Sequence, residues 1–342
     1  MEYSINQWLT RKVLDLIVRY YSCLSYKSLH QQRSLMRQQQ TIRKPVMCTG
    51  VGLHSGCRVS LTLTPAPPDT GIVFIRTDLS AKPRVPVTIA NVRPTLLSTT
   101  VGVDGVQVQT IEHLLAATAG LGIDNLYVEV DAPELPALDG SATPFVDLLQ
   151  EAGIAPQNRY RSYLKIVRPI DVTEGEKQIS IRPASTASVT YTIDYDHPLI
   201  RRQAYTYDWS SDSFIRDIAP ARTFGFLREV EALWEAGLGL GGSLHNTLIL
   251  SDEGLLNEGG LRYRDEFVRH KVLDLVGDMT LLGMPVVGEI LAIRSGHAMH
   301  ASLVSRILES RDNWVLVSAE PHAPAGRLRE LPPSLVASPQ RD

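Results

Sequence analysis

Three polar side chains spaced four residues apart constrain this chain more than any other feature. His270, Asp274 and Asp278 occur in the segment DEFVRHKVLDLVGDM, and positions i, i+4 and i+8 lie on one face of an α-helix. The residues around them are mostly apolar, which indicates a largely buried helix. A buried polar stripe is costly unless something binds it. A metal ion is the natural partner, because His at i and Asp at i+4 can both reach one cation.

A second segment, QTIEHLLAATAGLGIDN, offers a further ligand. Thr110 is predicted to cap an apolar helix that ends near Gly120 and Gly122. His113 would complete a His₂Asp set, and three protein ligands with an open fourth position are typical of catalytic zinc. The adjacent Glu112 would be a suitable general base. Taken alone, a His-x-x-x-Asp pair or a Glu-His dipeptide is also typical of a protein surface, so spacing leaves that alternative open.

Six motifs follow one another along the chain in a fixed order. They are GVGLHSG at 50–56, TIEHLLAATAGLGIDN at 110–125, APELPALDGSATPFV at 132–146, ARTFGF at 221–226, FVRHKVLDLVGD at 267–278 and SGHAMH at 295–300. In this order and at these separations they resemble the bacterial UDP-3-O-acyl-N-acetylglucosamine deacetylase family, over roughly residues 36 to 316. The resemblance implies zinc-dependent hydrolysis of the N-acetyl group, with release of acetate, as the committed step of lipid A biosynthesis.

The resemblance also assigns roles to single residues. His113, His270 and Asp274 match the zinc ligands of the family, and Zn²⁺ is the cofactor that it implies. Glu112 matches the base that takes a proton from the attacking water. Thr223 in ARTFGF matches the hydroxyl that stabilises the oxyanion.

The proton donor is expected downstream, in SGHAMH. His297 matches a charged imidazolium that stabilises the oxyanion and protonates the leaving amine, and Asp278 is expected to hydrogen-bond it and keep it charged. His300, three residues further on, is interpreted as a surface histidine. For His54, in GVGLHSG, a structural hydrogen bond is the expectation.

Substrate contacts follow from the same resemblance. Lys271 matches a lysine near the sugar–nucleotide end of the substrate. Phe224 matches a phenylalanine whose ring packs on the substrate. Residues 228–250 occupy the position of an insert that forms a hydrophobic passage for the acyl chain. Their Leu, Trp and Gly content suits a tunnel wall, and equally a core helix followed by a strand.

Alternating strands and helices predict an α+β fold. Strands are expected at 59–66, 71–79, 125–132, 162–172, 178–184, 188–198 and 288–298, and helices at 110–120, 144–152, 228–236, 264–282 and 299–310. The resemblance implies two similar domains, 36–160 and 161–316, each with a sheet packed on paired helices and with the active site between them. Residues 317–342 are rich in Pro and polar residues and are interpreted as a disordered tail.

The first 35 residues differ from the rest. They carry five Lys/Arg against two acids, with an apolar stripe at helical spacing. A basic amphipathic anchor for the membrane surface is one interpretation; an accessory extension before a natural start at Met36 is the favoured one.

Composition limits the function without deciding it. A net charge of −3 argues against a nucleic-acid partner. Three cysteines, all in the first sixth of the chain, fit no disulfide framework and suit a reducing cytoplasm. No apolar run is long enough to span a membrane, so an acylated UDP-GlcNAc would be taken from the membrane surface or as a monomer. The protein is expected to be a monomer.

Two rival hypotheses stay open at this level. One is a related zinc amidase that acts on another acylated sugar nucleotide. The other is a non-catalytic relative that binds an acyl chain or a nucleotide. The second is disfavoured because the predicted base, ligands and proton donor are all present.

Overall fold

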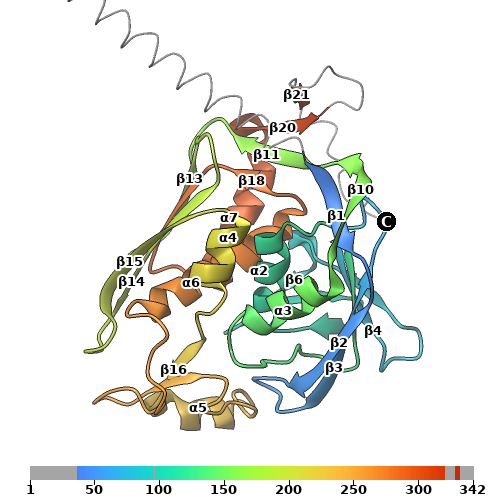
Figure 1. The fold of residues 1–342 in the computed structure, drawn as a ribbon. Helices are drawn as coiled ribbons and strands as arrows, with labels where there is room; N and C mark the ends of the chain where they lie inside the picture. The colour runs from blue at the N-terminus through green and yellow to red at the C-terminus, as the bar shows by residue number, and fades with distance from the viewer. Residues whose placement is uncertain (1–36, 96, 320–327, 332–342) are drawn as a thin grey trace, which may run out of the picture.

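The computed structural model describes residues 37–95, 97–319 and 328–331. Two five-stranded sheets form the outer layers, and the main helices lie between them (Figure 1). The mixed α+β class predicted from the sequence is therefore confirmed.

The first sheet has the strand order β2-β3-β9-β4-β5. The β4–β9 pair is parallel, and the other pairs are antiparallel. Along β3, Val59, Leu61 and Leu63 are buried at alternate positions, as expected for a strand with one face on the core. The bounds are β2 Val46–Val51, β3 Arg58–Pro65, β4 Ile72–Arg76, β5 Arg84–Pro86 and β9 Leu126–Val130.

The second sheet repeats this arrangement as β12-β13-β19-β14-β15. Its β14–β19 pair is parallel, and the other pairs are antiparallel. The order and the sense of pairing match those of the first sheet strand for strand. The bounds are β12 Ile170–Glu174, β13 Lys177–Arg182, β14 Ser188–Tyr195, β15 Arg201–Asp208 and β19 Glu289–Ile293.

Two helices from each half of the chain pack in the middle layer. They are α2 Glu112–Leu121, α3 Thr143–Ala152, α6 Glu266–Asp278 and α7 His297–Glu309. Helices α2 and α6 pack directly on each other. Gly277 makes this approach possible, because a Cβ at this position would lie 2.2 Å from the carbonyl oxygen of Glu112.

Shorter elements complete the described fold. They are β1 Gln38–Ile42, β6 Val92–Arg93, β7 Thr100–Val103, β8 Val106–Val108, β10 Ile154–Tyr160, β11 Ser162–Ile166, β16 Phe224–Phe226, β17 Leu248–Leu250, β18 Val286–Val287, β20 Trp314–Ala319, β21 Leu328–Leu331, α4 Ser211–Ser213 and α5 Val230–Glu235. No helix of the described residues is long and apolar enough to cross a membrane.

Several sequence predictions differ from the structure. The single strand expected over 162–172 is two strands, β11 and β12, which belong to different sheets. Thr110 does not cap α2: Ile111 is the N-cap residue, without a side-chain cap, and Thr110 has a left-handed φ of 56°. Its hydroxyl instead donates to the buried carboxylate of Glu134. The helix predicted over 264–282 ends at Asp278 and continues as a 3-10 turn. Strands β20 and β21 extend into the segment predicted to be a disordered tail; 320–327 and 332–342 lie outside the described residues.

Candidate active site

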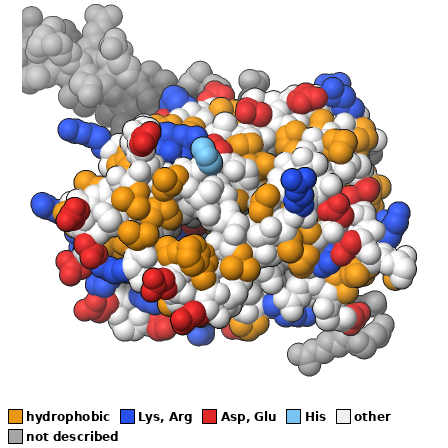
Figure 2. Space-filling model, turned by 90° about the horizontal axis from the view of Figure 1, so that it is seen from below, with side chains coloured by type: hydrophobic (Ala, Val, Ile, Leu, Met, Phe, Trp, Pro, Cys, Tyr) orange, Lys and Arg blue, Asp and Glu red, His pale blue; other side chains and the backbone are white. Residues whose placement is uncertain are grey.

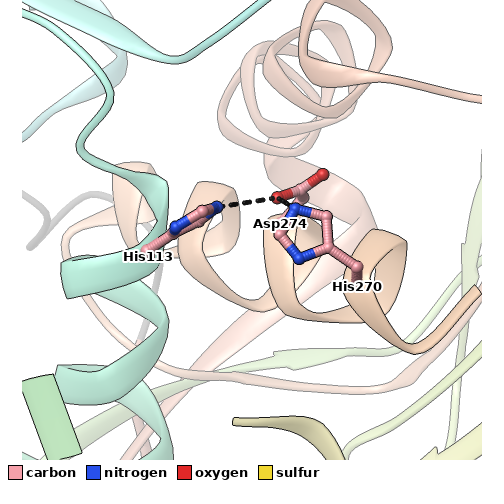
Figure 3. A group of neighbouring side chains, drawn as sticks. All are labelled: His113, His270 and Asp274. Atoms are coloured by element: carbon pink, nitrogen blue, oxygen red, sulfur yellow. Dashed lines mark ion pairs between the residues drawn. The ribbon is translucent and has the colours of Figure 1, made fainter. Parts of the chain in front are cut away.

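Helices α2 and α6 bring the three predicted metal ligands together. His113 comes from α2, His270 and Asp274 come from α6, and all three are buried (Figure 3). Their ligand atoms lie within 4.8 Å of one another. The Nε2 atoms of His113 and His270 lie 3.8 Å and 3.4 Å from Oδ1 of Asp274. Two imidazoles and one carboxylate thus converge on one point, as a metal site requires.

The protonation of both histidines suits metal binding. Nδ1 of His270 lies 3.0 Å from the carbonyl oxygen of Ala221, and only a protonated nitrogen can donate there. Nε2 is then the free lone pair, and it faces the cluster. Burial lowers the pKa of His270, and burial together with the closeness of the His270 ring lowers the pKa of His113 to about 3. Both rings are therefore neutral at pH 7, which is the form that binds a metal.

Asp274 presents one oxygen to the histidines and the other to a lysine. The ammonium of Lys271 donates to Oδ2 at 2.6 Å. Burial raises the pKa of Asp274, but Lys271 and the histidines more than offset this, and the net pKa is lowered. Burial lowers the pKa of Lys271, but Asp274 and nearby tyrosines outweigh burial. The net pKa is raised, so the amine stays charged.

Glu112 and His297 lie opposite each other beside this cluster. Oε1 of Glu112 lies 3.9 Å from Nε2 of His297, and that nitrogen lies 4.0 Å from Oδ2 of Asp274. Burial raises the pKa of Glu112 to about 7, against the opposing charge of His297. Burial lowers the pKa of His297, but Asp278 and Glu112 outweigh it and raise the pKa to about 9. A carboxylate ready to accept a proton thus stands opposite an imidazolium ready to give one.

Asp278 holds His297 as the sequence predicted, at 2.7 Å from Oδ2 to Nδ1. Two further partners of this site were missed. The hydroxyl of Thr99 donates to Oδ1 of Asp278, and the backbone N–H of Thr99 donates to Oε2 of Glu112 at 3.0 Å. His300 was interpreted as a surface histidine, which is wrong: it is fully buried, with Nδ1 2.7 Å from Oδ2 of Asp278. A loop threonine carries no sequence signal, whereas His300 falls on the inner face of α7, one turn after His297.

The ARTFGF loop lies beside α6. Thr223 is half-buried, and its backbone N–H donates to the carbonyl oxygen of Gly140 at 2.9 Å. The ring of Phe224 lies 5.1 Å from Phe267 and 6.4 Å from His270, measured between centroids. The loop therefore places Phe224 against α6, the helix that carries His270.

His54 differs from the other histidines of the motifs. Its backbone N–H donates to Glu134 at 2.8 Å, while Nδ1 of its ring has no hydrogen-bond partner among the described residues. The structure therefore shows a hydrogen bond of its backbone but none at Nδ1 of the ring, where one was expected.

The insert after this loop is bracketed by β16 and β17, which pair in parallel. Helix α5 has no buried residue, so it is not a core helix. Two backbone N–H groups of the insert, those of Leu240 and Gly241, donate to the carbonyl oxygens of His54 and Leu53. The insert therefore packs on the GVGLHSG turn.

Comparison with known proteins agrees with this site. A family model described as LpxC, UDP-3-O-acyl N-acetylglycosamine deacetylase, matches residues 39–309. A protein of Hahella chejuensis, named UDP-3-O-acyl-N-acetylglucosamine deacetylase, is 49% identical over 83% of this chain and 95% of its own length. Proteins of the same name from Marinobacter nauticus and Myxococcus xanthus are each 48% identical, over 85% and 82% of this chain and 96% and 90% of their own lengths. The chain therefore belongs to the UDP-3-O-acyl-N-acetylglucosamine deacetylase family, and it is a hydrolase that performs this deacetylation in lipid A biosynthesis.

Proposed function

We propose that the deacetylation depends on one zinc ion, held by His113, His270 and Asp274. The observation that carries this proposal is the convergence of two neutral imidazole nitrogens and one carboxylate oxygen from two buried helices. Nitrogen and carboxylate donors of this kind suit zinc, and three ligands leave a position open for chemistry. When bound, the ion polarises the acetamide carbonyl and lowers the pKa of a water molecule.

The chain's own residues then move the protons. Glu112 takes a proton from the attacking water, and its raised pKa makes it a suitable base near neutral pH. His297, charged at neutral pH, stabilises the oxyanion and protonates the leaving amine. Asp278 orients His297 through Nδ1, so that Nε2 faces the reacting groups. The hydroxyl of Thr223 is the further donor to the oxyanion.

Substrate contacts are proposed at the edge of the cluster. Phe224 stacks near the sugar, because its ring already lies against α6. Lys271 binds the sugar–nucleotide end and also keeps Asp274 ionised.

We propose that residues 228–250 guide the acyl chain. Four large apolar side chains in or beside this insert are about half exposed: Leu227, Trp234, Leu240 and Leu244. Figure 2 shows the face on the side of α5, where hydrophobic side chains gather between charged ones. An acyl chain would cover these side chains, and removing apolar surface from water is favourable.

The matched strand order of the two sheets supports two similar domains, 36–160 and 161–316, with the active site between α2 of one and α6 of the other. We place the reaction in the cytoplasm, where the free thiols of Cys48 and Cys57 stay reduced. A monomer that meets its substrate at the membrane surface completes the proposal.

The ligand assignment is tested with His270→Ala. Its metal content, measured by elemental analysis, should fall sharply, and acetate release from acyl-UDP-GlcNAc should fall with it. His245→Ala is the control for metal content, because His245 is exposed and lies outside the cluster. If His270→Ala kept stoichiometric metal, the assignment would be wrong. Elemental analysis of wild-type protein purified without added metal, with and without oxygen, distinguishes zinc from ferrous iron.

A further inference from the structure

His300 is tied to the proposed proton donor through one shared oxygen. It lies one turn after His297 on α7, and both Nδ1 atoms are 2.7 Å from Oδ2 of Asp278. On its other side, Nε2 of His300 lies 3.3 Å from the hydroxyls of Tyr191 and Ser295. His300 is fully buried, so it contacts neither solvent nor substrate.

The hydrogen atom between Asp278 and His300 can be placed. Asp278 is ionised, because its pKa is lowered to about 2, where the donors from His297 and His300 outweigh burial. An ionised carboxylate only accepts, so Nδ1 of His300 must carry the proton. Burial lowers the pKa of His300, which leaves Nε2 as an acceptor. The hydroxyl of Tyr191 donates to the carbonyl oxygen of Ser295 at 2.7 Å, and the Ser295 hydroxyl donates to the Tyr191 hydroxyl at 2.9 Å, with Nε2 of His300 at 3.3 Å from both hydroxyls.

Asp278 is thereby held from three sides. Its Oδ1 accepts from the hydroxyl of Thr99, and its Oδ2 accepts from both histidines. A carboxylate with a single donor could rotate about its side-chain bonds, and the ring of His297 would rotate with it. With three donors the carboxylate has one orientation, and Nε2 of His297 keeps its position 3.9 Å from Glu112.

We propose that His300 is a positioning residue for deacetylation, which fixes Asp278 and through it the proton-donating face of His297. This inference rests on the proposed function of His297. In this role the neutral ring of His300 donates a hydrogen bond to Asp278, and Asp278 orients the imidazole of His297.

A second cation is the rival explanation for the same side chains, since Asp278, His297 and His300 also have ligand atoms within 4.8 Å of one another. The distances favour hydrogen bonds. Both Nδ1 atoms lie at 2.7 Å from one oxygen, which is ordinary hydrogen-bond spacing and leaves no room for an ion between them.

Three substitutions separate the two sides of the imidazole. In His300→Asn the amide nitrogen takes the place of Nδ1, so the donor to Asp278 remains. His300→Gln places its amide toward Tyr191 and Ser295 and loses that donor. His300→Leu loses both. We expect kcat to fall about tenfold to a hundredfold in the Gln and Leu variants, the scale of one hydrogen bond to a charged group, with KM and metal content unchanged. We expect the Asn variant to retain most of kcat.

A double-mutant cycle with His297→Ala links the effect to its target. If His300 acts through His297, then His300→Gln should cause no further loss of kcat in the His297→Ala background. Equal losses in the Asn and Gln variants, or additive losses in the double variant, would show that His300 only stabilises the fold. Two equivalents of metal in the wild type, falling to one in His300→Gln, would establish the second cation instead. The proposed role of His297 fails separately, if His297→Ala alone retains kcat.

Discussion

At the residue scale, opposite charge states in one small site carry the chemistry. The pKa of Glu112 is raised because its carboxyl is buried beside other carboxylates, and the pKa of His297 is raised because Asp278 binds its Nδ1. Each group is thus set to the protonation state that its role requires near neutral pH. Two predictions follow from this pair.

Replacing Glu112 removes the base and leaves the metal ligands. We expect Glu112→Ala to retain stoichiometric metal and to lose roughly 10²–10⁴ in kcat, the usual scale for a positioned proton carrier. Elemental analysis and acetate release measure the two effects. Glu151→Ala is the matched control, because this glutamate is exposed at the end of α3. Near-normal turnover in Glu112→Ala would contradict the mechanism.

The pH dependence of kcat/KM should be bell-shaped. Glu112 acts only when deprotonated, so the rate rises as pH passes its pKa, about 7 for the protein alone. His297 acts only when protonated, so the rate falls as pH passes its pKa, about 9 for the protein alone. A bound cation disfavours protons on both groups, so both limbs should lie below these values. Because the two groups interact, the limbs report the pair. A rate that keeps rising through the alkaline range would exclude His297 as the acid.

Spacing alone predicted part of this site. The i, i+4, i+8 positions of His270, Asp274 and Asp278 place them on one helix face whatever the rest of the fold does. Thr99 could not be predicted in this way, and for His300 the spacing indicated a helix face shared with His297 but not its burial. Thr99 reaches Asp278 and Glu112 only because the fold brings a distant loop beside α6. The burial of His300 depends on what packs against α7.

At the element scale, the spacing between α2 and α6 controls the metal site. A Cβ at Gly277 would lie 2.2 Å from the carbonyl oxygen of Glu112, a backbone atom that cannot move alone. We expect Gly277→Ala to push the helices apart and to lower both metal affinity and kcat/KM. A displacement of about 1 Å can cost about 10²-fold in rate. Gly259→Ala is the control, because nothing lies within 4 Å of its Cβ position. Wild-type metal content and rate in Gly277→Ala would show that the helix spacing is not critical.

The acyl passage is tested at the contact between the insert and the GVGLHSG turn. A Cβ at Gly241 would lie 2.1 Å from the carbonyl oxygen of Gly52, so Gly241→Ala should displace the insert. We expect kcat/KM to fall for substrates with a long 3-O-acyl chain and to change little for a substrate with a 3-O-acetyl group. Each buried methylene contributes about 0.8 kcal/mol, so the wild type should prefer long chains by orders of magnitude. Gly259→Ala serves again as the control. Equal rates of the wild type on acetyl and long-acyl substrates would rule the passage out.

Hydrophobic periodicity predicted the middle of the long elements better than their ends. The expected helix near 110–120 is α2, but its start was misread, because Thr110 resembles a cap by residue type. Its hydroxyl bonds Glu134 instead, a residue that the sequence places 24 positions away. The start of α2 therefore depends on a tertiary contact, and local helix propensity cannot predict such a contact.

At the scale of the whole molecule, the active site depends on both halves of the chain. One proposed metal ligand and the proposed base come from α2, and the other proposed ligands and the proposed proton donor come from α6 and α7. The two sheets share one strand order, yet no residue-level repeat is visible in the sequence. Each strand requires only alternating burial, which many different residues can provide, so similar sheets need not share residues. The matching strand order of the two sheets could therefore be expected from family resemblance and not from periodicity.

The last prediction concerns the segment before the family domain. Residues 1–35 lie outside the described part of the chain. The family model begins at residue 39, and the Hahella relative matches over 95% of its own length but 83% of this chain. No ligand, base or proton donor proposed here lies in this segment. Deleting residues 1–35 should therefore leave the melting temperature and the rate of acetate release nearly unchanged.

The membrane-anchor alternative for this segment makes a different prediction. Five basic residues and an apolar stripe would bind an anionic lipid surface through charge and burial. The deletion would then lower binding to vesicles that contain anionic lipid, while turnover on a dispersed substrate stays the same. Cosedimentation of full-length and truncated protein with anionic and with zwitterionic vesicles separates the two cases. A truncated protein that misfolds, or that loses most of its turnover without detergent, would contradict both, because the segment would then be part of the working enzyme.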